Sequence, residues 1–107
     1  MPSPSPVRGS QSGRPIMVLL DVLGKRWTLR ILWEIRDGSL TFRALQDACG
    51  GISPTVLNAR LKTLREYGMV ELTDAGYGLT ADGKELGQYL TKLDGWATVW
   101  AEKNFPG

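Results

Sequence analysis

Residues 53–67 carry polar and basic side chains at spacings that suit contact with nucleic acid. In a helix, Thr55, Asn58 and Lys62 would share one face, because each residue turns the chain by about 100°. Asn and Lys side chains hydrogen-bond to base edges in the major groove, and Lys also pairs with phosphates. A solvated surface helix can look the same, so the interpretation depends on the surrounding elements. The full outer face comprises Thr55, Asn58, Ala59, Lys62 and Glu66, with Arg65 near its edge and Arg60 at its border.

Enzymatic chemistry has little support in this chain of 107 residues. It has no histidine and one cysteine, which removes the commonest general base and any zinc site of the usual Cys/His kind. It also has no Gly-rich phosphate loop or nucleophile elbow. We therefore expect no catalysis, no cofactor and no metal.

Charge is distributed unevenly along the chain, although the net charge is only +2. Through Gly68 there are ten Lys/Arg and five Asp/Glu, a net charge of +5, and from Met69 onward there are three Lys and six Asp/Glu, a net charge of −3. A basic first part and an acidic second part suggest a surface for a polyanion and a separate surface for another partner. Chance clustering in a small protein would give the same division.

The residues that must position this face form one helix with both ends marked. Ser53 is a good N-cap and Pro54 suits the first helical position. Gly68 can take the left-handed conformation that ends a helix. Leucines at three-and-four spacing should form the buried side: Leu57, Leu61 and Leu64.

Three shorter helices are expected before this one. The first spans residues 16–23, is apolar on nearly every side, and should be buried, partly against another subunit. The second spans about residues 28–36, and the third starts after the N-cap Thr41 and runs to about residue 48. Residues 49–51 form a glycine-containing turn into the helix over residues 53–67, the recognition stretch, and this completes a helix-turn-helix. Basic side chains at two helix starts, Lys25 and Arg43, could reach phosphates.

After Gly68 the chain predicts a small hairpin and a long final helix. Residues 69–73 alternate as a strand, residues 74–76 form the turn, and residues 77–80 return. Thr80 can cap a helix over about residues 81–103. Its apolar residues repeat at coiled-coil-like spacing and predict a homodimer seam, packed with the first helix. The expected interface comprises Met17, Leu20, Leu86, Leu90, Leu93, Trp96, Ala97 and Trp100.

The composition of the chain predicts a disordered N-terminal tail and a single domain. Residues 1–15 are rich in Pro, Ser and Gly and should form a disordered tail before a single domain over residues 16–107. No apolar run is long enough to span a bilayer, no signal-peptide pattern is seen, and a single cysteine favours a reducing compartment. We expect a cytoplasmic, mainly α-helical winged helix-turn-helix.

The order of these motifs resembles the HxlR-type transcription regulators, a branch of the MarR-like winged-helix proteins. The resemblance covers about residues 16–101. Its most specific part is Ile52-Ser-Pro54, followed by Leu57-Asn-Ala-Arg-Leu61 and Gly68-Met-Val70. Further matching residues are Leu23-Gly-Lys-Arg-Trp-Thr28, Ile31-Leu32, Gly38, Leu40-Thr-Phe-Arg-Ala-Leu45, Leu64, Leu79-Thr-Ala-Asp-Gly83 and Trp96.

This resemblance implies a dimeric bacterial regulator that binds palindromic operators on the nucleoid and dimerises through its terminal helices. It implies no membrane partner. It places one set of residues against the major groove, namely Ser53, Thr55, Asn58, Ala59 and Lys62. It makes the cations Lys25, Arg43 and Arg60 candidates for phosphate contacts, to which the position of Arg65 adds a fourth.

Two departures from the family pattern bear on regulation. Many members carry a cysteine just before the first helix, used in some for redox or aldehyde sensing, and here that position is Pro15. Cys49 lies instead in the turn before the recognition stretch, where a plain buried residue is favoured over a redox switch. The hairpin is shorter than usual and has no Lys or Arg, so contact between the wing and the minor groove is in doubt.

Two other functions remain open on the sequence. One is a ligand-gated sensor, with a small-molecule effector held among tryptophans between the terminal helices. The four tryptophans are Trp27, Trp33, Trp96 and Trp100. The other is a winged-helix module used for protein contacts alone, which the uncharged wing would suit.

Overall fold

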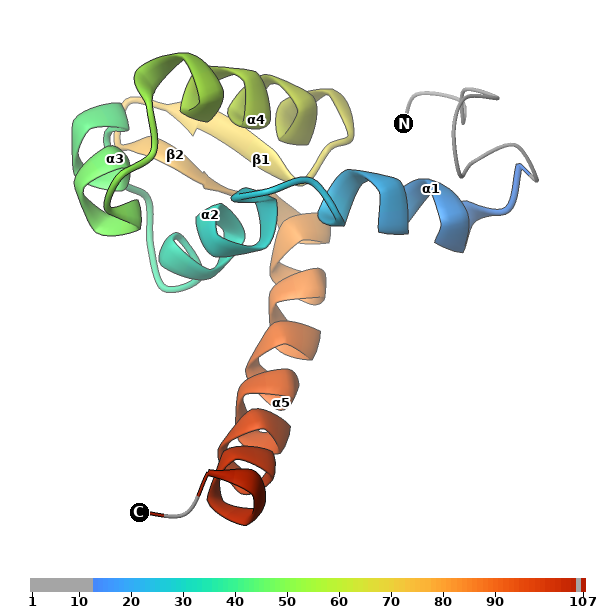
Figure 1. Ribbon diagram of the computed structural model, residues 1–107. Coiled ribbons are helices and arrows are strands. Elements are labelled where there is room, and N and C mark those ends of the chain that lie inside the picture. Colours follow the sequence, from blue (N-terminus) through green and yellow to red (C-terminus); the bar gives the residue numbers. More distant parts are fainter. Residues whose placement is uncertain (1–12, 106) are drawn as a thin grey trace.

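Five helices and a two-stranded hairpin make up residues 13–105 and 107, the part of the chain that the computed structural model describes. The first twelve residues of the expected tail lie outside this part, and Pro15 already belongs to the first helix. The hairpin and α2–α4 form one body, with α1 extending to one side and α5 projecting away from it (Figure 1). In chain order the elements are α1 (Pro15–Leu23), α2 (Thr28–Glu34), α3 (Phe42–Cys49), α4 (Pro54–Glu66), β1 (Val70–Thr73), β2 (Gly76–Leu79) and α5 (Ala81–Asn104).

Three of the helices begin at the hydroxyl caps that the sequence predicts. Thr41 Oγ1 accepts a hydrogen bond from Ala44 N at 3.1 Å, and Ser53 Oγ accepts one from Val56 N at 3.1 Å. Thr80 Oγ1 caps α5 through the backbone N–H of residue 83. These bonds satisfy backbone donors that a helix start leaves without a partner, which fixes where α3, α4 and α5 begin.

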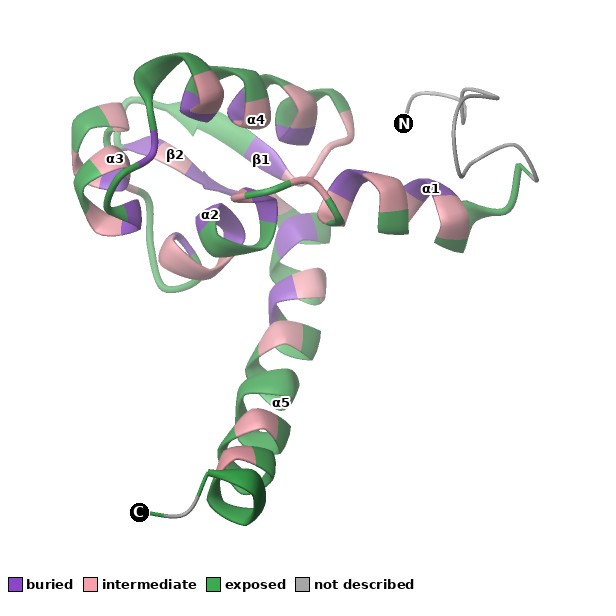
Figure 2. Ribbon diagram, in the orientation of Figure 1, coloured by how far each residue is buried: buried purple, intermediate pink, exposed green. Residues whose placement is uncertain are grey.

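The core lies between α2, α3, α4 and the inner side of the hairpin. Figure 2 shows the buried residues facing this common centre. The predicted leucine face of α4 is confirmed, because its three leucines are at most 1% exposed. The fully buried side chains of the core are Ile31, Leu32, Ile35, Leu45, Leu57, Leu61 and Leu64, with Thr28.

The hairpin pairs Val70 with Leu79 and Thr73 with Gly76, so its second strand starts and ends one residue before the predicted limits. A single further bridge ties it to the chain before α3, where Leu40 N donates to Tyr77 O at 3.0 Å and Tyr77 N to Leu40 O at 2.8 Å. Gly76 has φ of 112°, and a Cβ there would collide with the backbone of Leu40. Glycine therefore allows the wing to lie directly against the start of α3.

The two terminal helices are only partly packed onto the body. In α1, Val18 and Val22 are buried, but Ile16 and Leu20 are about half exposed, so the predicted burial holds on one side only within a single chain. In α5, only Gly83 and Gly87 are buried. Gly83 lies against the carbonyl of Met69, so its lack of a side chain serves contact with the hairpin and not with another helix.

None of the helices in the described residues combines the length and the apolar character that a membrane span requires.

Candidate nucleic-acid interface

The outer side of α4 is open along its whole length. Thr55, Asn58, Ala59, Lys62 and Arg65 are all exposed, while the leucines of the opposite side are buried. The helix runs over the top of the body in the view of Figure 1. Its exposed polar residues lie on the side opposite the buried leucines. An α-helix presented in this way has the shape and polarity that fit a major groove.

At the start of α4, the Ser53 hydroxyl caps the helix and keeps a proton that it can donate. Ser53 Oγ accepts from Val56 N, which leaves the hydroxyl proton able to donate to another group. Pro54 follows at the first helical position. The N-terminal end of a helix carries a partial positive charge, which favours a nearby phosphate.

The far end of α4 faces the wing across a shallow hollow of about 530 Å³. Two cations line it, Lys62 and Arg65, but two carboxylates line it as well, those of Glu66 and Glu71. Leu72 of β1 completes the hollow and is 49% exposed. The net attraction of this edge for phosphate is therefore weaker than the two cations alone would give.

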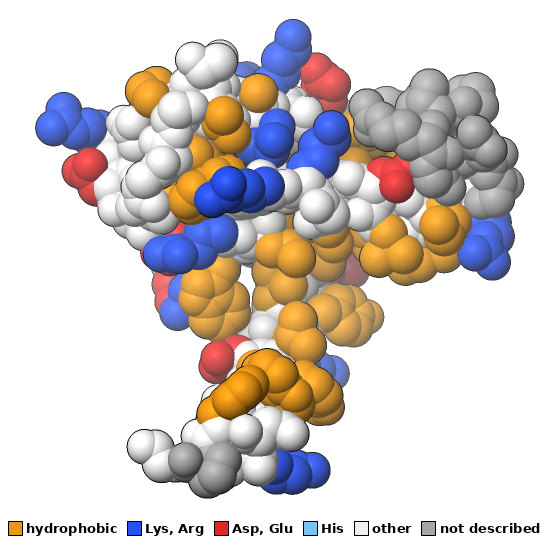
Figure 3. All heavy atoms as spheres, viewed as in Figure 1, with side chains coloured by type: hydrophobic (Ala, Val, Ile, Leu, Met, Phe, Trp, Pro, Cys, Tyr) orange, Lys and Arg blue, Asp and Glu red, His pale blue; other side chains and the backbone are white. Residues whose placement is uncertain are grey.

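The other predicted phosphate contacts are Arg43, Arg60 and Lys25. Arg43 is held only loosely, and the other two belong to or contact the segment between α1 and α2. Arg43 Nε is 3.8 Å from Asp47 Oδ2, and both side chains are largely exposed, so this pair costs little to break. Arg60 Nε donates to Arg26 O at 2.9 Å, in the segment between α1 and α2 that also contains Lys25. Figure 3 shows Lys and Arg side chains over the upper half of the molecule and hydrophobic side chains over α1 and α5.

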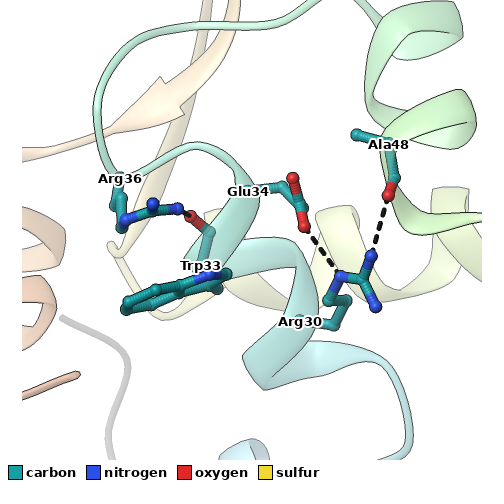
Figure 4. A network of polar contacts seen from close by, with 5 residues as sticks. All are labelled: Arg30, Trp33, Glu34, Arg36 and Ala48. Carbon is teal, nitrogen blue, oxygen red and sulfur yellow. Dashed lines mark hydrogen bonds and ion pairs between the residues drawn. The ribbon is translucent and has the colours of Figure 1, made fainter. Parts of the chain in front are cut away.

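One structural cation has no role assigned from the sequence. Arg30 Nε donates to Glu34 Oε2 at 2.7 Å, and Arg30 Nη2 donates to Ala48 O at 2.9 Å (Figure 4). The first bond could have been found from the four-residue spacing of Arg and Glu, but the second joins residues that are 18 apart. The guanidinium holds the C-terminal end of α3 against α2, and so fixes the turn that leads into α4.

Cys49 ends α3 inside the core. Its side chain is 2% exposed, and burial raises the pKa of its thiol, an effect that nearby Arg30 partly opposes. A buried neutral thiol is a poor nucleophile. The described residues contain no group of three or more His, Cys, Asp or Glu that could hold a metal ion.

The four tryptophans of the expected effector pocket do not converge within one protomer. Trp33 lines an apolar hollow of about 310 Å³ between α2 and α5, and Trp96 and Trp100 line a separate hollow of about 310 Å³ near the end of α5. Trp27 packs against the core. The first hollow is lined by Leu29, Arg30, Trp33, Leu90, Leu93, Asp94 and Ala97.

Comparison with known proteins agrees with this geometry. Residues 22–105 match the family model described as HxlR-like helix-turn-helix. The chain is 33% identical over 93 residues to the HTH-type transcriptional regulator YvaP of Bacillus subtilis, covering 80% of this chain and 86% of that protein. The structure of quinone-bound YodB from B. subtilis superposes with a TM-score of 0.71 and 30% identity, covering 78% of this chain and 94% of that one. A MarR-family regulator from Enterococcus faecalis superposes with a TM-score of 0.72 and 26% identity, covering 92% and 93%.

Proposed function

Because this chain belongs to the HxlR-like helix-turn-helix family of transcription regulators, we propose that it binds palindromic operator DNA as a homodimer. Each protomer would place α4 in the major groove, in two half-sites about 34–36 Å apart along the duplex. The observation that carries the proposal is the exposed polar side of α4, which lies opposite three buried leucines. Such a regulator would act on the nucleoid of a bacterial cytoplasm.

Base reading is assigned to the middle of α4. Asn58 can bond an adenine edge in two places, Lys62 can donate to guanine, and Thr55 can contact either base or a thymine methyl group. Ser53, at the start of the helix, would lie near the DNA backbone. The small side chain of Ala59 would let the helix approach the floor of the groove closely. Phosphate contacts are assigned to Lys25, Arg43, Arg60 and Arg65.

Dimerisation is supported by apolar surface that one chain leaves open. In α5, Leu93, Trp96 and Trp100 are 55%, 62% and 43% exposed, and Leu20 of α1 is 52% exposed. Exposed apolar patches of this kind mark interaction sites. Leu86 and Leu90 already pack partly on their own core, so they would contribute less to the seam. The proposed interface comprises Met17, Leu20, Leu86, Leu90, Leu93, Trp96, Ala97 and Trp100.

Gel-shift titration with an operator selected from random DNA tests this function. Asn58→Ala should relax the preference at one base position and cost about 1–3 kcal/mol of binding free energy. Lys62→Ala should weaken binding and relax the preference for guanine at its base position. Lys84→Ala, an exposed lysine on α5, is the matched control and should bind like the wild type.

Two results would contradict the assignment. If Asn58→Ala and Lys62→Ala together leave affinity and selectivity unchanged, α4 is not the reader. If the wild type binds no DNA even at low salt, where phosphate attraction is greatest, the chain is better explained as a protein-interaction module.

A small-molecule effector is a second candidate, favoured by the apolar hollow between α2 and α5. YodB, a similar structure, is known in a quinone-bound form. A planar conjugated molecule such as a quinone would fit against Trp33 and beside Arg30 in this hollow. Titration with benzoquinones should quench tryptophan fluorescence and release operator DNA, and a Trp33→Leu variant should lose both responses. Release without any dependence on Trp33 would contradict binding in the hollow.

A further inference from the structure

Arg60 joins the recognition helix to the segment between α1 and α2. Its Nε donates to Arg26 O at 2.9 Å, although the two residues are 34 apart in sequence. Arg60 is itself half-buried at the border of the leucine face. An arginine has a single Nε–H, so this bond fixes the plane of the guanidinium and turns one edge of it toward the protein.

The bond acts on a strained peptide. Trp27 has φ of 80°, and it is the only residue besides glycine with positive φ in the described chain. The carbonyl of Arg26 belongs to the peptide group that ends at Trp27 N, so rotating this peptide to relieve φ of Trp27 would swing the carbonyl away from Arg60. Conformations of this kind persist where the surroundings hold them.

The strained turn sets the direction of α1. The helix ends at Leu23, and residues 24–27 then turn the chain into α2. The outer side of α1 carries Ile16 and Leu20, which are about half exposed, and Leu20 belongs to the proposed dimer interface. A change at residues 24–27 would therefore change the angle between the dimer arm and α4.

We propose that Arg60 is a positioning residue that fixes the angle between α1 and α4, and thereby sets the distance between the two recognition helices of the homodimer. This inference rests on the proposed function, and it adds a positioning role, carried by Nε, to the phosphate contact proposed for Arg60. Half-site spacing in an operator mirrors the geometry of the dimer. The preferred spacing would then depend on the hydrogen bond from Nε and not on the charge of Arg60.

Two substitutions separate these roles. Arg60→Gln removes the charge but keeps an N–H donor, because Gln Nε2 is attached to Cδ as Arg Nε is. Arg60→Met has a similar length and no donor. Arg65→Met is the control, since Arg65 is an exposed cation of the same helix. Affinity is measured for operators whose half-sites are moved apart or together by one base pair.

For the wild type and Arg60→Gln, we expect a one-base-pair change in spacing to cost at least about tenfold in affinity. Arg60→Met should bind the three spacings within about threefold of one another, while Arg65→Met binds more weakly but keeps the wild-type preference. The comparison is a ratio within each variant, so a smaller folded fraction cancels. If Arg60→Gln and Arg60→Met lose affinity equally at every spacing, or if the wild type binds DNA with no spacing preference, the inference is overturned.

A distance measurement without DNA separates this inference from the proposed function. Spin labels on Asn58→Cys in a Cys49→Ala background report the separation of the two α4 helices in the dimer. We expect a narrow distribution of the distance between the two labels when residue 60 is Arg or Gln, and a broad distribution for Arg60→Met. Equal distributions in all three would overturn the positioning role, whereas failure of the wild type to bind DNA would overturn the proposed function alone.

Discussion

At the scale of single residues, Thr80 connects the start of α5 to the chain just after α4 through one hydroxyl. Its Oγ1 accepts from Gly83 N at 3.1 Å and donates to Gly68 O at 2.5 Å, so the cap of α5 is also bonded to the end of the recognition helix. Thr80→Ala should lower the free energy of unfolding by about 1–2 kcal/mol, as expected for a lost cap and a carbonyl left without its partner.

Urea denaturation measures this change. Thr98→Ala is the matched control, because the hydroxyl of Thr98 bonds only the carbonyl of Asp94 within its own helix, at an exposed position. Its effect should stay within about 0.5 kcal/mol. If Thr80→Ala loses no more unfolding free energy than Thr98→Ala, the two hydrogen bonds of the Thr80 hydroxyl contribute no stability.

Cys49 should make stability fall at high pH. Burial raises the pKa of its thiol above the usual value of 9.0, so the folded chain keeps a proton that the unfolded chain releases as the pH passes that value. The contribution of this thiol to stability is complete below pH 9 and is lost above it. Between pH 7 and pH 10, the wild type should lose more unfolding free energy than Cys49→Ala. Parallel losses in the two proteins would be evidence against a buried neutral thiol.

Local contacts could be predicted from the sequence and distant ones could not. The caps at Thr41, Ser53 and Thr80 depend on residues three positions away, so the sequence alone identifies them. The partners of Arg30 and Arg60 lie 18 and 34 residues away and depend on how the helices pack. For this reason the sequence offers Arg60 as a surface cation, and only the structure shows its bond to Arg26.

At the scale of elements, α4 has a buried side that serves stability and an exposed side to which we assign DNA recognition. Leu61 is 1% exposed, and Leu61→Ala should cost about 2–5 kcal/mol of unfolding free energy through lost burial and a cavity. Ala59 lies on the exposed side. Ala59→Leu should leave stability within about 0.5 kcal/mol of the wild type, because an exposed helical site tolerates leucine. It should nevertheless lower operator affinity at least tenfold, about 1.4 kcal/mol, by holding the helix out of the groove.

Thermal melts and gel shifts on both variants check this separation. Tight operator binding by Ala59→Leu would exclude close approach of this side to DNA. A mild stability loss in Leu61→Ala would mean that the core around α4 relaxes to fill the space.

The hairpin shows why short elements are predicted less well than long ones. Alternating side chains identify both strands, but the turn is tighter than expected because Gly76 already pairs with Thr73. The bridge from Leu40 to Tyr77 involves one residue pair and leaves no periodic signal. The position of the wing against α3 therefore becomes visible only in the folded chain.

At the scale of the whole molecule, the proposed homodimer rests on the apolar surface of α5. The far half of α5 extends beyond the body and exposes Leu93, Trp96, Val99 and Trp100. Trp96→Glu should convert a dimer to monomers, because it would bury a charge in the proposed seam. The fold of each monomer should persist, since Trp96 is 62% exposed and contributes little to the core.

Light scattering after size exclusion measures the mass, and circular dichroism checks the fold. Gln88→Glu, at an exposed position on the same helix, introduces the same charge and should remain dimeric. A Trp96→Glu protein of unchanged dimer mass would place the seam elsewhere. The periodic apolar residues of α5 could be recognised from the sequence, but their pairing with a second copy stays a prediction, because a single chain cannot show it.

The stacked indoles near the end of α5 would give an optical probe of the proposed dimer. The rings of Trp96 and Trp100 lie 6.0 Å apart and 14° from parallel, and Phe105 meets Trp100 edge-on at 5.1 Å. Neighbouring indoles couple their excited states, so this cluster should give a near-ultraviolet dichroism signal that changes when a second cluster approaches. Dilution of unlabelled protein would then report the dissociation constant of the pair, with no dye, tag or DNA present.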